Sequence, residues 1–110
     1  MNASPADIDC LLAEMRDLIE RRRISFTERK KTMDTLSSLG ISINDAICDI
    51  YDLQKTDYYS GPLCDRDFPS DTPLWVFKKK SHNELIYIKF KIQHIPTDIL
   101  LVVSYHIDEQ

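Results

Sequence analysis

Three apolar-rich segments near the C-terminus most constrain the fold, because apolar and polar residues alternate along each of them. The segments cover residues 74–80, 85–92 and 99–106. Successive side chains of a strand point to opposite faces, so this alternation is typical of strands that bury one face only. Short polar turns separate the segments. We therefore expect three strands joined into an antiparallel sheet that spans residues 74–108.

The two faces of this predicted sheet differ in character. If alternation is strict in all three strands, one face is apolar and carries Trp75, Phe77, Ile86, Ile88, Phe90, Ile92, Leu101, Val103 and Tyr105. The other face then carries Val76, Lys78, Tyr87, Lys89, Lys91, Leu100, Val102, Ser104 and His106. The pattern fixes this phase in the middle strand, and we infer it for the outer two.

Helices are predicted before the sheet. Ser4 and Ser42 have the position and type of N-cap residues, each followed by apolar residues at helical spacing. A further helix is expected over residues 28–38, with Thr27 as its N-cap and Met33 facing inward. The helices are predicted to pack on the apolar face of the sheet.

These elements predict an α+β fold with N-terminal helices on one face of a small antiparallel sheet of about three strands. We interpret residues 1–110 as a single domain, since a chain of this length can bury one core. The domain divides into a helical part at 4–59, a loop at 60–73 and the sheet at 74–108.

The charge balance restricts the functions that we consider. The chain has 14 basic and 18 acidic side chains, a net charge of −4, which argues against strong general binding of nucleic acid. The segment 74–110 differs, because its five lysines outnumber its four acids. The lysines are thus concentrated on the predicted sheet, and a local basic cleft is compatible with the acidic whole.

The cysteines and the apolar segments predict neither a metal site nor a membrane anchor. The three cysteines lack the spacing of zinc ligands, and we expect Cys10 and Cys48 to be small core residues. No apolar run is long enough to cross a bilayer, and the first residues do not have the pattern of a signal peptide. We expect a cytoplasmic protein without a cofactor.

The polar face of the sheet has the side chains that metal-free RNA cleavage needs. This reaction removes a proton from a 2′-hydroxyl, stabilises extra charge on the phosphate and protonates the leaving 5′-oxygen. Histidine changes charge near neutral pH, so His106 suits the proton transfers. Lys89 and Lys91 can stabilise the phosphate, and Tyr87 can position it or stack on a base.

Further phosphate contacts are expected from Lys78, from Ser104 and from Arg66 in the predicted loop. The guanidinium of arginine matches the geometry of phosphate. An alternative for Arg66 is an ion-pair cluster with its neighbours Asp65 and Asp67. Lysines on a strand face can also be a solvated surface, and a histidine near the chain end can be an exposed residue without a role.

Four short motifs, in order, resemble the MqsR-like toxins of bacterial type II toxin–antitoxin systems, within the RelE-like superfamily. They are the run Thr56-Asp57-Tyr58-Tyr59, the strand that contains Trp75, the run Ile86-Tyr87-Ile88-Lys89 and the final Ser104-Tyr105-His106. The resemblance covers about residues 28–107. It implies a RelE-like fold and a small endoribonuclease that cuts mRNA until an antitoxin sequesters it.

The resemblance also implies residue roles and shows two departures. Tyr87 matches the tyrosine of the family's active site, and Lys89 matches the lysine beside it. Ser60 stands where the family has a basic residue, and His106 replaces a lysine near the C-terminus. Arg66, Lys78 and Lys91 are candidates to supply the missing positive charge.

We therefore expect a metal-independent mRNA endoribonuclease that acts on free or ribosome-bound mRNA, with a DNA-binding antitoxin as its protein partner. The catalytic residues would be His106, Lys89 and Tyr87. The main alternative is a non-catalytic RelE-like interaction module that binds a protein through the same sheet, with contacts from Tyr58, Tyr59, Val76, Leu100 and Val102. A third possibility is an accessory domain without toxicity.

Overall fold

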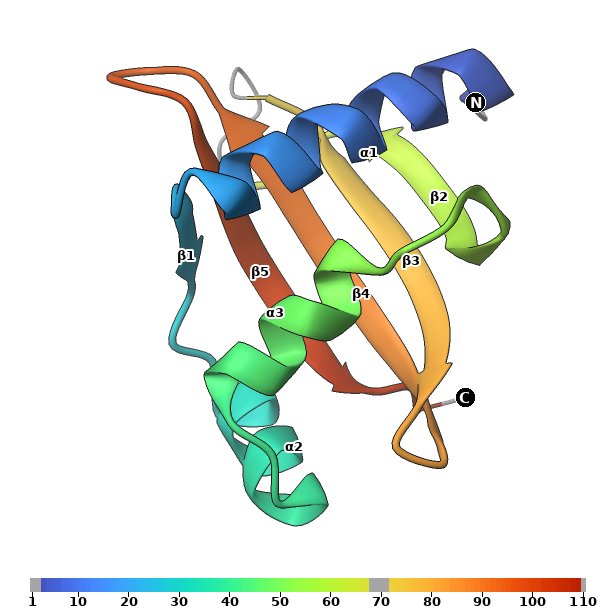
Figure 1. The fold of residues 1–110 in the computed structure, drawn as a ribbon, viewed down its shortest axis with the longest axis vertical. Helices are drawn as coiled ribbons and strands as arrows, with labels where there is room; N and C mark the ends of the chain where they lie inside the picture. The colour runs from blue at the N-terminus through green and yellow to red at the C-terminus, as the bar shows by residue number, and fades with distance from the viewer. Residues whose placement is uncertain (1–2, 68–71, 110) are drawn as a thin grey trace.

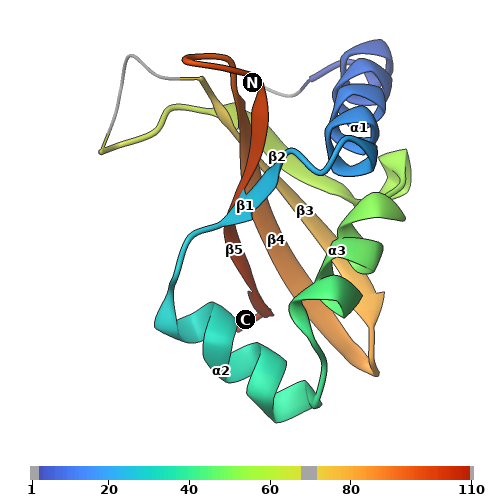
Figure 2. The same ribbon diagram turned by 60° about the vertical axis from the view of Figure 1, so that its left-hand side comes forward.

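The computed structural model describes residues 3–67 and 72–109. Its elements follow the order α1 (Pro5–Glu20), β1 (Ile24–Phe26), α2 (Lys30–Leu39), α3 (Ile43–Tyr51), a 3-10 turn (Lys55–Asp57), β2 (Tyr58–Leu63), β3 (Leu74–Ser81), β4 (Glu84–Gln93) and β5 (Ile99–Ile107). The helices α1 and α3 lie on the same face of the sheet (Figure 1), and α2 lies at one end of it, beside β5. The opposite face is not covered by a helix of the described residues (Figure 2), and we call it the open face.

The sheet has five strands in the order β1-β5-β4-β3-β2, so the α+β class is confirmed and the expected number of about three strands is too low. The central meander of β3, β4 and β5 is antiparallel, whereas β1 pairs with β5 in parallel. The pattern of the sequence misses β1 because three residues are too few to show a period. It misses β2 because Gly61 and Pro62 are typical of loops.

The helix starts are confirmed for α1 and α3 and shifted for α2. Ser4 and Ser42 each accept a hydrogen bond from the amide three residues later, and the acid there bonds back to the cap. Thr27 does not cap α2, because its hydroxyl donates to the carbonyl oxygen of Val103 at 2.7 Å. Its amide also extends the pairing of β1 with β5. The helix α2 therefore begins at Lys30.

The position of α2 is set by two threonines. The hydroxyl oxygen of Thr32 accepts from the amide of Tyr105, and that of Thr35 accepts from the amide of Ile107, each at 3.3 Å. The amides of Tyr105 and Ile107 lie on the edge of β5 beyond the end of β1, where no strand of the described residues pairs with them. The two threonines supply the acceptors that these amides would otherwise lack. Since α2 packs through these threonines, Met33 is 51% exposed, and the prediction that it faces inward is wrong.

The core lies between the sheet and the helices α1 and α3. Its largest fully buried side chains include Met15, Leu18, Ile50, Phe77 and Phe90, and the two phenyl rings stack with centroids 5.5 Å apart. All three cysteines are exposed, so the prediction that Cys10 and Cys48 are core residues is wrong. On α1 the buried stripe runs through residues 8, 11, 12, 15 and 18, and Cys10 lies outside it.

A β-bulge at Val103 changes the phase of β5. Lys89 pairs with Ser104, but the next residue, Phe90, pairs with Val102, so Val103 is an extra residue in the ladder. Before the bulge Leu100 and Val102 face the core, and after it Tyr105 does. The expectation that Leu101 and Val103 face inward, and that Leu100 and Val102 face outward, is therefore wrong. Strict alternation cannot account for an inserted residue.

Candidate functional site

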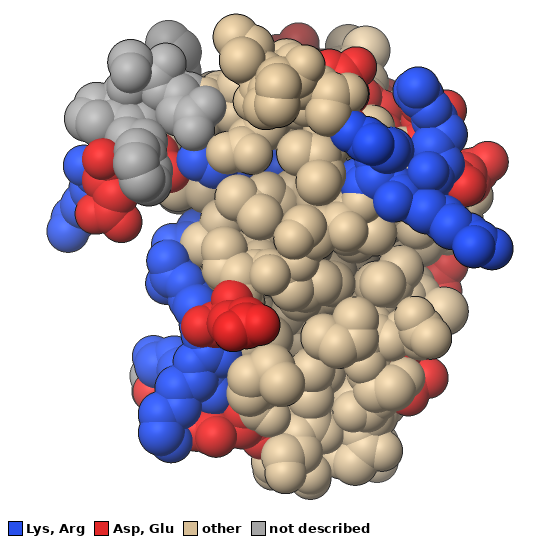
Figure 3. Space-filling view, turned by 90° about the vertical axis from the view of Figure 1, so that its left-hand side faces the viewer, with Lys and Arg blue, Asp and Glu red and all other residues tan. Residues whose placement is uncertain are grey.

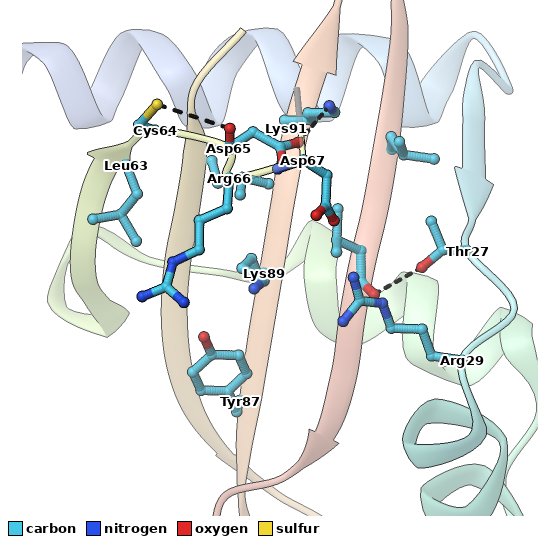
Figure 4. A pocket seen from close by; sticks show the side chains of 13 residues that line it. Thr27, Arg29, Leu63, Cys64, Asp65, Arg66, Asp67, Tyr87, Lys89 and Lys91 are labelled. Carbon is cyan, nitrogen blue, oxygen red and sulfur yellow. Dashed lines mark hydrogen bonds and ion pairs between the residues drawn. The ribbon is translucent and has the colours of Figure 1, made fainter. Parts of the chain in front are cut away.

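The open face holds a groove of about 630 Å³, which we call the main groove. Its walls come from β4, β5, the segment after β2 and the segment between β1 and α2 (Figure 4). A smaller cavity of about 330 Å³, the helix-end pocket, lies beside the start of α2. The two cavities share Arg29, Tyr87 and Lys89. These shared residues place Tyr87 and Lys89 at the centre of the candidate site.

Tyr87 and His106 form a stacked pair at this centre. They are directly opposite each other on β4 and β5, with ring centroids 4.8 Å apart and planes at 18°. The Nδ1 atom of His106 lies 2.9 Å from the carbonyl oxygen of Ile107. Because a carbonyl oxygen only accepts, Nδ1 carries the hydrogen, and Nε2 is left to take or give a proton. Burial raises the pKa of Tyr87, so its phenol is a hydrogen-bond donor.

Lys89 is the cation beside this pair. Burial lowers the pKa of its ammonium, and the positive charge of Arg29 lowers it further. No carboxylate of the described residues lies within ion-pair distance of Lys89. The lysine is therefore a charge without a fixed partner, in a position where an anion would gain from it.

Two arginines flank Lys89. Arg66, from the segment after β2, and Arg29, from the residue before α2, extend from opposite sides toward the main groove (Figure 4). Neither forms an ion pair with another residue in the described part of the chain. Basic side chains also gather along the margin of the molecule that carries the open face (Figure 3). The sequence pattern does not reveal Arg29 as a site residue, because the predicted helix start at residue 28 places it inside a helix.

Arg66 is not part of the ion-pair cluster that the sequence offers as an alternative. Asp65 Oδ2 instead lies 2.9 Å from Lys91 Nζ, and Asp65 Oδ1 accepts a hydrogen bond from the amide of Asp67. These contacts order the segment after β2. They leave the guanidinium of Arg66 available to a ligand in the main groove.

Lys91 and Lys78 are on the open face as predicted, but their charges are already matched. The Lys91 side chain is 3% exposed and pairs with Asp65 in the wall of the main groove. Lys78 Nζ lies 3.0 Å from Asp108 Oδ2 and 3.9 Å from the centroid of the Tyr59 ring. The hydrogen bond to Asp108 raises the pKa of Lys78. The structure thus separates these two lysines from Lys89, whose charge is unmatched.

Ser104 is buried and faces the helix-end pocket together with His106. The structure brings six of the seven predicted site residues to these two cavities, namely Arg66, Tyr87, Lys89, Lys91, Ser104 and His106. Lys78 lines neither cavity and lies one strand further, opposite Tyr87.

A second polar cluster lies on the helix side of the sheet. Asp49 of α3 accepts hydrogen bonds from Tyr105 at 2.6 Å and from Ser81 at 3.0 Å, and it contacts His82 at 3.0 Å. Burial raises the pKa of Tyr105, and the bond to Asp49 adds to the shift. Serine and histidine both bond to the carboxylate here rather than to each other, so this cluster lacks the order of a Ser-His-Asp triad. These contacts hold α3 against β5, the end of β3 and the turn that follows β3.

The described ranges 3–67 and 72–109 contain neither a metal-binding cluster nor a membrane-spanning helix. No three His, Cys, Asp or Glu side chains lie together in a way that could hold a metal ion. None of the described helices has the length and apolar character needed to cross a membrane.

Comparison with known proteins adds no relative. No model of a known protein family matches the chain, and a search of curated proteins found no similar sequence. The geometry of the open face therefore carries the functional argument.

Proposed function

We propose that this protein is a metal-independent endoribonuclease and the toxin of a type II toxin–antitoxin pair, related to the MqsR-like toxins. The single observation that carries the nuclease proposal is the placement of Tyr87, Lys89 and His106 side by side on an open sheet face. The toxin role rests on the four sequence motifs that resemble that family. Its protein partner would be a DNA-binding antitoxin.

The charges around the main groove support a phosphodiester as the ligand. Four basic side chains line the groove against two carboxylates, an excess of two positive charges in a chain whose net charge is −4. Lys91 is matched by Asp65, so the excess of two is the charge of Arg29, Arg66 and Lys89 less that of Asp67. Cations in such a concave surface attract an anion more strongly than the same charges on a flat one.

The proposed reaction uses His106 for proton transfer and the cations for charge. A 2′-hydroxyl attacks the adjacent phosphorus, and its proton passes to a base. The bond from phosphorus to the 5′-oxygen breaks, and that oxygen takes a proton. The products are a 2′,3′-cyclic phosphate and a 5′-hydroxyl. His106 Nε2 is placed to exchange these protons, because Nδ1 is held by the carbonyl of Ile107.

The other residues act on the phosphate. Lys89 would stabilise the charge that develops on the phosphoryl oxygens, with Arg66 as an auxiliary contact. Tyr87 would position the substrate through its hydroxyl, since its raised pKa keeps the phenol protonated. Arg29 takes the place that we expected Lys91 to fill, because the ammonium of Lys91 is held by Asp65.

The test is to map the ends of RNA incubated with the purified chain in EDTA, with and without ribosomes. We expect cuts with 5′-hydroxyl ends, and we expect His106→Ala to slow cleavage about 100-fold or more, as for loss of a general acid or base. Lys89→Ala should have an effect of similar size. The matched controls are His94→Ala in the turn before β5 and Lys55→Ala in the 3-10 turn, which remove exposed side chains that contact acids of α1 and line neither cavity of the open face.

Two results would contradict the proposal. If folded His106→Ala and Lys89→Ala variants cut RNA as fast as the parent, the site is assigned to the wrong residues. If the folded parent cuts no RNA in either condition, the protein is not a nuclease of this kind.

The interaction module is the second candidate, and one observation favours it. Tyr59 is 59% exposed on β2, where an apolar contact with a protein partner is feasible. The other contacts expected for this candidate weaken it, because Val76, Leu100 and Val102 are buried inside the protein and Tyr58 is packed against the core. RNA binding that weakens steeply with salt would favour the nuclease over this module.

A further inference from the structure

The helix-end pocket overlaps the proposed site of cleavage, because Tyr87, Lys89 and His106 line one side of it, and its other side has features of its own. It is lined by Arg29, Lys30, Lys31, Tyr87, Lys89, Ser104 and His106, in a volume of about 330 Å³. The hydroxyl of Thr32 accepts from the amide of Tyr105, which fixes the first turn of α2 beside this part of β5. The first residues of the helix and the side chain of Ser104 thus face the same small space.

The start of α2 offers unused hydrogen-bond donors. The first hydrogen bond that closes a turn of this ten-residue helix runs from the amide of Met33 to the carbonyl of Arg29. No side chain caps the helix, and the amides of Lys30, Lys31 and Thr32 bond to no group in the described part of the chain. Free amides at a helix start, together with the helix dipole, favour an anion.

Ser104 gives an independent indication of a ligand. The residue is only 5% exposed, and it lines the pocket. Its hydroxyl forms no hydrogen bond with any residue that the structure describes. Because the rest of the residue is enclosed, this hydroxyl can meet a further partner only from within the pocket. A buried hydroxyl that faces uncapped helix amides therefore points to a ligand that accepts hydrogen bonds from both.

The lysines of the same turn do not compete for this space. Lys30 Nζ lies 2.8 Å from Asp34, and Lys31 Nζ lies 3.8 Å from Glu109. Both ammonium groups are exposed and directed at carboxylates outside the pocket. The backbone amides, Ser104 and Arg29 are left to bind the anion.

We propose that the helix-end pocket binds a second phosphate of the same RNA strand. The amides of Lys30 and Lys31 and the hydroxyl of Ser104 donate to its oxygens, and Arg29 lies between this phosphate and the one that is cleaved. That the phosphate belongs to RNA rests on the proposed nuclease function, whereas the anion site itself does not. The RNA strand then runs from the main groove past Tyr87 to the start of α2.

The test is a titration of the ¹⁵N-labelled chain with inorganic phosphate at constant ionic strength, followed by the amide signals in NMR spectra. We expect saturable shifts of the Lys30 and Lys31 amides. Ser104→Ala should weaken the apparent affinity about tenfold, as for loss of one hydrogen bond to a charged group. Ser37→Ala, the same change near the other end of α2, should leave the affinity unchanged. A 2′-deoxy tetranucleotide, which cannot be cleaved, should displace the phosphate.

A second variant covers the case in which Ser104→Ala does not fold. Arg29→Gln changes an exposed residue, and it should also weaken phosphate binding. Shifts that do not saturate, or that are the same in these variants as in the parent, would overturn the inference, and so would a tetranucleotide that leaves bound phosphate in place.

The result is separate from that of the cleavage assay. If phosphate shifts the Lys30 and Lys31 amides but RNA is not cut, the anion site holds and the nuclease proposal fails. If RNA is cut without such shifts in the phosphate titration, the nuclease proposal holds and this inference fails.

Discussion

Replacing Lys91 with methionine removes a charge that the structure places inside the protein. The Lys91 side chain is 3% exposed, its ammonium lies 2.9 Å from Asp65, and the Asp65 side chain is 13% exposed. Removing one partner of a buried ion pair costs about 3–5 kcal/mol, because the other charge stays desolvated. Since the Asp65 carboxylate is less buried than the Lys91 ammonium, we expect the lower end, about 3 kcal/mol.

Urea denaturation measures this cost. With a slope of about 1.5 kcal/mol per molar urea for a chain of this size, Lys91→Met should lower the midpoint by about 2 M. The matched control is Lys80→Met on β3, an exposed lysine whose loss should change stability by less than about 0.5 kcal/mol. The double variant Lys91→Met with Asp65→Asn should recover part of the loss, because neither charge is then left buried.

One result would refute the structural argument. If Lys91→Met unfolds at the same urea concentration as the parent but binds RNA more weakly, the ammonium contacts RNA rather than Asp65. The prediction from sequence, that Lys91 binds phosphate, would then be the better one.

Three more outcomes are expected. Because burial lowers the pKa of Lys89, its charge is present below the lowered pKa and lost above it, so RNA cleavage should decline at a lower pH than an ordinary lysine would set. Lys89→Arg should move this alkaline decline of kcat/KM upward, and an unmoved decline would assign it to another group. Thr32→Val should cost about 1–3 kcal/mol in urea denaturation, since the amide of Tyr105 loses its acceptor, and a loss under about 0.5 kcal/mol would show that this bond is dispensable. Gly61→Ala should cost at least about 2 kcal/mol in the same urea assay. Gly61 has φ 128°, and an added Cβ would lie 3.1 Å from Trp75 Cα. An unchanged stability would contradict the backbone described for β2.

The sequence by itself determined the elements whose signals are local. Ser4 and Ser42 start helices because a side chain three residues from its partner amide bonds to it in any context. Gly40 ends α2 in the left-handed conformation that glycine adopts without a steric cost. The middle strand alternates without interruption, so it placed Tyr87 and Lys89 on the open face correctly.

The rest of the sheet was decided by the tertiary structure. The strands β1 and β2 form because distant strands supply hydrogen-bond partners, and neither carries a period of its own. Along β5, residues 100–103 are all apolar, so their order does not tell which of them face the core. The bulge at Val103 settles this through the pairing with β4, and it allows Leu100 and Val102 to face inward while Ser104 and His106 face the open side.

The charges of the site were decided in the same way. A lysine in an alternating strand looks the same whether its ammonium meets a carboxylate or solvent, so the sequence could not separate Lys91 from Lys89. Contacts between residues far apart in the chain make the two lysines different. Asp65 pairs with Lys91, whereas the packing of α2 on β5 brings Arg29 beside Lys89. Composition and alternation fix which side chains a face receives, and only the folded chain fixes which of their charges stay unmatched.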